Sequence, residues 1–185
     1  MNHHAGAGIV SAFPALAAIL EGYADALGSD FLPYRNHACR VANLCAAGVA
    51  PSTDALDKIA IAAAFHDLGI WTDQTFDYLV PSARLAIAHL EAIDRADWIP
   101  EIAAMIFNHH KVTPLREHPE WLVEPFRRAD WIDVTGGLFT RGATRRLGKA
   151  LYATWPGAGF HRRLLALEAA HLRAHPLNPL PFFRL

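Results

Sequence analysis

The stretch from residue 56 to residue 66 constrains the fold more than any other part of the chain. After Lys58 it contains only Ile, Ala and Phe until His66 is reached, and Asp67 follows at once. A helix that is apolar all round is stable only when it is buried on every side. The sequence therefore predicts a central helix that ends in an imidazole and a carboxylate.

The rest of the chain also favours helices, because alanine is abundant and alternating apolar and polar segments are hard to find. Prolines near helix starts and glycines near helix ends mark the boundaries. Ser52 or Thr53 is expected to cap the central helix, and Pro125 to kink a later one. Further helices are expected over residues 14–28, 33–47, 81–93, 101–110, 120–136, 139–152 and 161–173, and a proline-rich tail, 176–185, extended over the body. We expect an all-α fold, one compact bundle of about eight helices spanning residues 1–185.

Size and composition fit one domain. The chain has 185 residues, of which 52% are hydrophobic and 19% charged, so its core needs neither disulfides nor a structural metal. The net charge of −1 gives no sign of a nucleic-acid or membrane surface. The charges are unevenly spread, however: residues 1–126 carry 7 basic and 15 acidic side chains, and residues 127–185 carry 10 and 3. This asymmetry favours attraction between two parts of one fold or, alternatively, arginines that face an anionic ligand.

The cysteines and the apolar stretches indicate a cytoplasmic protein without a membrane span. Cys39 and Cys45 lie on one expected helix with Cα atoms about 9 Å apart, too far for a disulfide bond. We expect them to be reduced core residues, as in a cytosol. The apolar run over residues 9–20 is too short to cross a bilayer and continues into Glu21.

Histidines carry the strongest chemical signal in the sequence. Five of the 11 lie on or at the ends of expected helices, mostly among apolar neighbours: His37, His66, His89, His109 and His110. Burying the imidazole of His66 beside the Asp67 carboxylate is costly unless both are hydrogen-bonded or bind a cation. Neutral imidazole nitrogen and carboxylate oxygen suit divalent zinc, manganese, iron, cobalt or nickel, so the pattern indicates a metal site.

Three motifs that contain histidine or aspartate follow one another along the chain. His37 lies within a helix, an apolar helix ends in His66-Asp67-Leu68-Gly69, and Ala129-Asp130 lies on a later helix. Together they resemble the HD superfamily of metal-dependent phosphohydrolases over residues 34–133, more than half of the chain. The resemblance implies that a first metal is held by His37, His66, Asp67 and Asp130.

Two choices within this ligand set follow the family pattern. Asp133 lies one helical turn after Asp130, and Arg128-Ala129-Asp130 is the better family match. Family members with two metals have additional histidines between the His-Asp pair and the final aspartate. By resemblance, a second metal is expected on His89 and one or both of His109 and His110, with Asp67 bridging the two ions. His89 is expected to point inward with Leu85 and Ile93.

The resemblance implies hydrolysis of a small phosphomonoester or phosphodiester, a nucleotide or a phosphorylated metabolite, by a metal-activated water. Asp67 would bridge or orient, and His110 or Lys111 would assist the leaving group. No Gly-Tyr-Pro follows Lys111, so hydrolysis of cyclic dinucleotides is not the expected activity. Candidate cations for an anionic substrate group are Lys111, Arg40, Arg127, Arg128, Arg145 and Arg146.

Other functions stay open at this point. One branch of the superfamily uses a di-iron pair and dioxygen to cleave C–C or C–P bonds, other relatives hydrate nitriles, and a binding or regulatory module would keep the fold without catalysis. For the phosphohydrolase we expect two divalent ions, a small anionic substrate, and no nucleic acid or membrane partner. A homo-oligomer is compatible with all of them.

Overall fold

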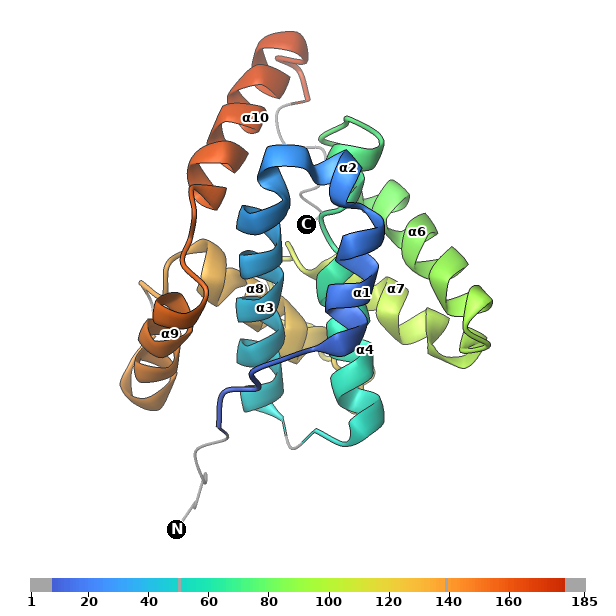
Figure 1. Ribbon diagram of the computed structural model, residues 1–185, viewed down its shortest axis with the longest axis vertical. Coiled ribbons are helices and arrows are strands. Elements are labelled where there is room, and N and C mark those ends of the chain that lie inside the picture. The colour runs from blue at the N-terminus through green and yellow to red at the C-terminus, as the bar shows by residue number, and fades with distance from the viewer. Residues whose placement is uncertain (1–7, 50, 139, 179–185) are drawn as a thin grey trace.

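The structure is a computed structural model that describes residues 8–49, 51–138 and 140–178. Across these residues all regular structure is helical, and eight helices have nine or more residues, which confirms the expected all-α bundle (Figure 1). The longer helices are α1 (Pro14–Gly22), α3 (Phe31–Gly48), α4 (Thr53–Phe65), α6 (Leu79–Ala92), α7 (Ile99–Asn108), α8 (Val123–Val134), α9 (Gly142–Thr154) and α10 (Phe160–Ala174). Short helical turns are α2 (Ala24–Leu27), α5 (Gly69–Thr72), and the 3-10 turns η1 (Gly28–Asp30) and η2 (Ala96–Trp98).

Several expected boundaries differ from the observed ones. The helix expected over 14–28 breaks at Tyr23 into α1 and α2, and the short helix α5 was not expected. Pro125 does not kink a helix, because it is the third residue of α8, where the backbone has no intrahelical hydrogen bond to lose. The extended tail expected over 176–185 lies outside the described residues from position 179 onward.

Helix α4 is the central helix that the sequence predicts. All of its residues from Ile59 to Phe65 are buried. It packs against α1, α3, α6 and α7. Ser52, rather than Thr53, caps its start: the Ser52 side chain accepts a hydrogen bond from the backbone N–H of Ala55 at 3.2 Å. Its other end, at His66, is consequently held in the middle of the bundle.

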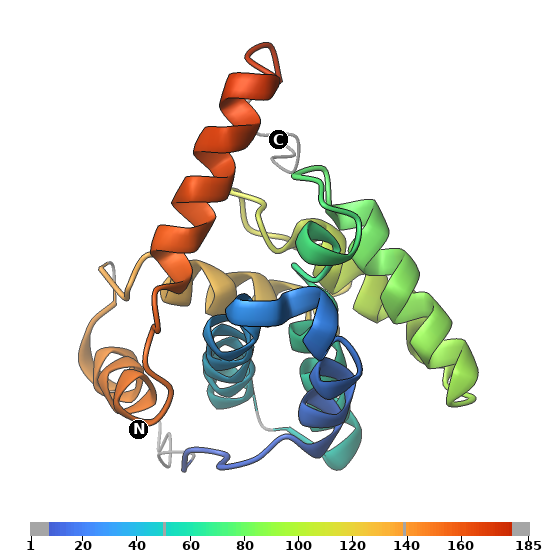
Figure 2. The ribbon, with the colours of Figure 1, turned by 45° about the horizontal axis from the view of Figure 1, so that its top comes forward.

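Helices α9 and α10 lie at the side of this bundle, and α10 projects away from it (Figures 1 and 2). Phe160, the first residue of α10, stacks on the ring of His37 with centroids 4.2 Å apart. Both cysteines are free and buried, as expected. No helix among the described residues is long and apolar enough to cross a membrane.

Candidate metal centre

Four helices bring the predicted ligands to one place. His37 comes from the middle of α3 and Asp130 from α8, while His66 and His109 are the residues at the ends of α4 and α7. They form two groups, in each of which the ligand atoms lie within 4.8 Å of one another: His37, His66 and Asp130 in the first, and Asp67, His109 and His110 in the second. Six of the seven predicted metal residues therefore meet in the structure.

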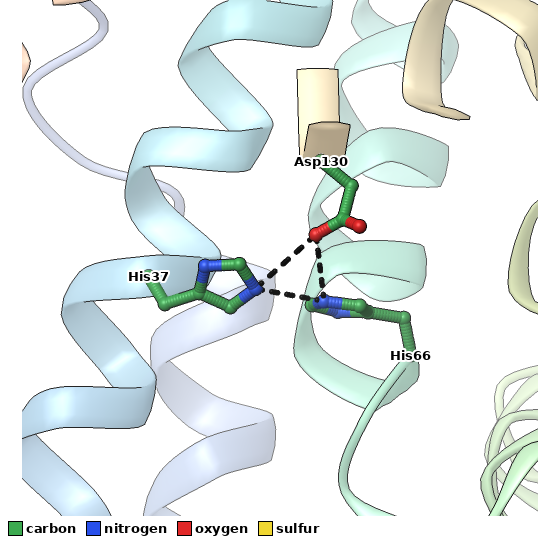
Figure 3. Close-up of side chains that lie close together, drawn as sticks. All are labelled: His37, His66 and Asp130. Carbon is green, nitrogen blue, oxygen red and sulfur yellow. Dashed lines mark hydrogen bonds and ion pairs between the residues drawn. The ribbon is translucent and has the colours of Figure 1, made fainter. Parts of the chain in front are cut away.

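The first group is arranged around three atoms that point toward one another (Figure 3). The Nε2 atoms of His37 and His66 lie 3.0 Å apart, and Asp130 Oδ1 is 3.4 Å and 3.7 Å from them. The opposite nitrogen of each ring is already used: His66 Nδ1 donates to the carbonyl of Ala63 and His37 Nδ1 to Asp133 Oδ2. When His37 is neutral, two imidazole lone pairs and a carboxylate oxygen thus face each other, an arrangement that a cation stabilises.

Asp67 lies between the two groups. Its Oδ2 is 3.3 Å from His66 Nε2, and its Oδ1 is 3.3 Å from His109 Nε2. His109 Nδ1 donates to the carbonyl of Ile106, so its Nε2 also presents a lone pair. Buried acceptors without a hydrogen-bond partner include Asp67 Oδ1, His109 Nε2 and Asp130 Oδ1. Because unpaired buried acceptors are costly, these atoms fit divalent cations on either side of Asp67.

His110 is held by Tyr78, a residue that no sequence pattern singled out. The Tyr78 hydroxyl and His110 Nε2 form a short hydrogen bond, and Tyr78 is buried. Burial, together with the neighbouring His109, lowers the pKa of His110 to about 3. A neutral His110 suits metal ligation and is a poor proton donor to a leaving group.

The role expected for Lys111 stays a prediction. Lys111 is half-buried and belongs to neither group of ligands. Its carbonyl accepts a hydrogen bond from Arg127 Nη1 at 2.8 Å, and Arg127 in turn pairs with Glu124. Arg127 therefore holds the loop at Lys111 and is not free to pair with an anionic substrate group.

The structure does not place His89 at the centre, which corrects the expectation that it binds the second metal. His89 does share a face of α6 with Leu85 and Ile93, but that face is half-buried to exposed. It packs against the Phe65 ring and lines a separate groove beside α1. The buried face of α6 consists instead of Leu79, Ser82, Ala83, Ala86 and Leu90.

Asp133 orients His37 instead of serving as a ligand. Its Oδ2 accepts from His37 Nδ1 at 2.8 Å, and Arg40 donates to both of its oxygens at 2.6 and 2.8 Å. Arg40 is buried and pairs with Asp133, so it cannot pair with an anionic substrate group. This corrects the expectation that it is a candidate cation for the substrate. Burial alone would raise the pKa of Asp133, but the His37 and Arg40 hydrogen bonds lower it to about 2. A carboxylate behind a ligating histidine fixes the ring and makes its free nitrogen a better ligand.

We expect Asp133→Asn to weaken metal binding about 10- to 100-fold, because the amide cannot hold the His37 ring as the carboxylate does. The melting temperature should also fall, since buried Arg40 loses its charge partner at a cost of about 3–5 kcal/mol. Metal titration and thermal denaturation measure the two effects. Asp97→Asn, at an exposed carboxylate paired with Arg95, is the matched control and should change neither. Unchanged metal affinity in Asp133→Asn would contradict the orienting role.

Metal affinity is expected to increase between pH 7 and pH 9. Burial alone would lower the pKa of His37, but the neighbouring carboxylates of Asp130 and Asp133 outweigh it and raise the pKa to about 9. Below that pH an ion must displace a proton from His37 before it can bind. Displacing one proton makes the apparent affinity about tenfold weaker for each pH unit below 9. Competition with a chelator of known pH dependence measures it, and a flat profile would show that His37 is not a ligand.

Comparison with protein-family models, with curated proteins and with solved structures finds no match to this chain. The fold and the site together define an all-helical protein with buried His/Asp groups that could hold metal ions. A more specific function has to be inferred from the motifs and from the geometry around Asp67.

Proposed function

We propose that this protein is a metal-dependent phosphohydrolase of the HD type, acting on a small phosphomonoester or phosphodiester with two divalent ions. The observation that carries the proposal is the position of Asp67. One of its oxygens faces His66 of the first group, and the other faces His109 of the second, at 3.3 Å in each case. A carboxylate placed in this way can bridge two ions.

Each residue of the centre has a defined task in this proposal. His37, His66 and Asp130 would hold one ion, and Asp67, His109 and His110 the other. When bound, two such ions supply an activated water and neutralise charge on a phosphoryl group.

Three of the histidines are fixed by a hydrogen bond from Nδ1. The backbone carbonyls of Ala63 and Ile106 accept it from His66 and His109, and the Asp133 carboxylate accepts it from His37. Three imidazoles therefore present the same nitrogen, Nε2, to the centre without rearranging, which lowers the cost of binding the ions.

Enclosure of the centre favours a second candidate function, oxidative cleavage of a C–C or C–P bond by a di-iron pair and dioxygen. Five of the six residues, all except His110, are at most 4% exposed. Exclusion of water suppresses side reactions of reactive species, so the enclosure suits oxidative cleavage. Metal identity separates the two functions.

The test is elemental analysis of protein purified without chelators, combined with turnover of p-nitrophenyl phosphate and bis(p-nitrophenyl) phosphate. We expect about two ions of manganese, cobalt, nickel or zinc per chain and release of p-nitrophenol, both lost in His66→Ala. His118→Ala, an exposed histidine outside both groups, is the control and should retain them. Two irons with a paramagnetic di-iron signal and no phosphatase turnover would favour the oxygenase. One ion under saturating conditions would contradict the two-ion centre.

A further inference from the structure

A second pocket lies behind the candidate metal centre, on the other side of Asp133. The carboxylate of Asp133 points to His37, whereas its backbone carbonyl accepts hydrogen bonds from the Tyr152 hydroxyl and His161 Nε2, both at 3.2 Å. Asp133, Tyr152 and His161 all line this pocket, which has a volume of about 630 Å³ and lies between the end of α8, α9 and the start of α10. Its size is that of a small-molecule site, for which roughly 300–1,000 Å³ is usual.

Uncompensated positive charge lies at this pocket. Arg145 and Lys149 both line it, and they stand four residues apart, on one face of α9. Both are exposed, and within the described part of the chain neither forms an ion pair or a side-chain hydrogen bond. Helix α9 contains no acidic residue. The acidic residue that lines the pocket is Asp133, whose carboxylate is already bound by Arg40 and His37.

Some other surface cations of the chain do have carboxylate partners. Arg84 pairs with Asp73, Arg95 with Asp97 and Arg163 with Asp30, although all three are surface residues. Within the described residues after position 126, several basic side chains form no ion pair, and Arg145 and Lys149 are the two of these that line the pocket.

Part of the pocket wall is apolar. Ile132, Val134 and Leu138 line it together with the ring of Tyr152 and the buried Leu44 and Leu151. Tyr152 and His161 already donate their polar hydrogens to the Asp133 carbonyl, so they offer a ligand their ring faces rather than hydrogen-bond donors. An occupant that matches these surfaces has an anionic group for Arg145 and Lys149 and an apolar or ring-bearing body for the walls.

We propose that this pocket binds a small organic anion, whose oxyanion group pairs with Arg145 and Lys149 and whose apolar body packs against Ile132, Val134 and Leu138. The site shares no metal ligand with the candidate metal centre, so the proposal stands independently of the proposed function. Phosphate, sulfonate and carboxylate groups share the chemistry that two adjacent cations recognise.

The test uses anilinonaphthalene sulfonate, a ring-bearing anion that becomes fluorescent in apolar pockets, and N-phenyl-1-naphthylamine, its neutral counterpart. The wild-type protein should bind one sulfonate probe per chain. In Arg145→Gln/Lys149→Gln we expect its affinity to fall about tenfold or more. The control Arg141→Gln/Arg146→Gln removes the same charge from residues that do not line the pocket, and its affinity should change less than threefold. Binding of the neutral probe should be the same in all three proteins.

A second variant fills the pocket without touching the core. Gly148 lines the pocket within α9, and a Cβ added there meets no atom within 4 Å, so Gly148→Leu should fold and abolish sulfonate binding. Circular dichroism and thermal melting establish that each variant is folded. The proposal is overturned if the Arg145/Lys149 variant binds as tightly as the wild type. It is equally overturned if the Arg141/Arg146 control weakens binding as much, or if Gly148→Leu, while folded, leaves binding unchanged.

Discussion

Asp67→Asn is expected to abolish binding of both ions and to reduce hydrolytic activity by about a thousandfold or more, well beyond the 10- to 100-fold effect of a lost outer partner. Asp67 is the residue whose two oxygens face both ligand groups. Burial alone would raise the pKa of Asp67, but His66 and His109 hold it well below its usual range, so the carboxylate is charged. Asparagine removes that charge and turns an N–H₂ group toward one of the ions.

The comparison with Asp73→Asn separates this effect from loss of a carboxylate in general. Asp73 is an exposed residue that pairs with Arg84, and its amide variant should keep both ions and full activity. Elemental analysis and turnover are measured on both variants, with circular dichroism to establish that Asp67→Asn is folded. Two retained ions and unchanged turnover in Asp67→Asn would rule out the bridging role.

The sequence predicts the centre of the site well because one physical constraint acts there. An apolar helix that ends in His66-Asp67 has to bury both side chains, and burial without a partner is costly. The same reasoning applies to His109, at the buried end of α7. Local sequence therefore carries enough information to place these residues together.

His89 shows where this reasoning fails. Its neighbours Leu85 and Ile93 are apolar and share its face, as expected, but α6 buries a different face that contains Ser82 and Ala83. In an alanine-rich helix, small residues can form the buried side because another helix packs close to them, and hydrophobic periodicity then points to the wrong face.

Tyr78 and Asp133 could not be assigned from sequence because their roles depend on contacts between distant segments. Tyr78 meets His110 from 32 positions away, and Asp133 meets His37 from 96 positions away. A tyrosine in a loop, or a second aspartate one turn after a ligand, has no local feature that reveals such a partner.

Gly69 is a further residue whose importance appears only in three dimensions, since the sequence marks it merely as the end of the central helix. It begins α5, and its backbone N–H donates to Ser82 Oγ at 2.9 Å. A Cβ at this position would lie 2.6 Å from the carbonyl oxygen of Tyr78 and 2.8 Å from the Cβ of Pro81. The first turn of α6 therefore packs directly on the backbone that follows His66 and Asp67.

Gly69→Ala is accordingly expected to destabilise the protein by about 4 kcal/mol, at the upper end of what overpacking costs. The atom that the new methyl group meets is a backbone carbonyl, which cannot rotate away as a side chain can. At this chain length the melting temperature should fall by about 8–16 °C.

Gly148→Ala is the matched control: its methyl group meets no atom within 4 Å, so it should stabilise α9 by about 0.5–1 kcal/mol. Because relief of the clash requires Tyr78 to move, Gly69→Ala should also release the hydrogen bond that holds His110 and weaken metal binding. A melting temperature within 2 °C of the wild type, as for an ordinary surface substitution, would show that α6 is free to shift and that its packing on Gly69 does not position the site.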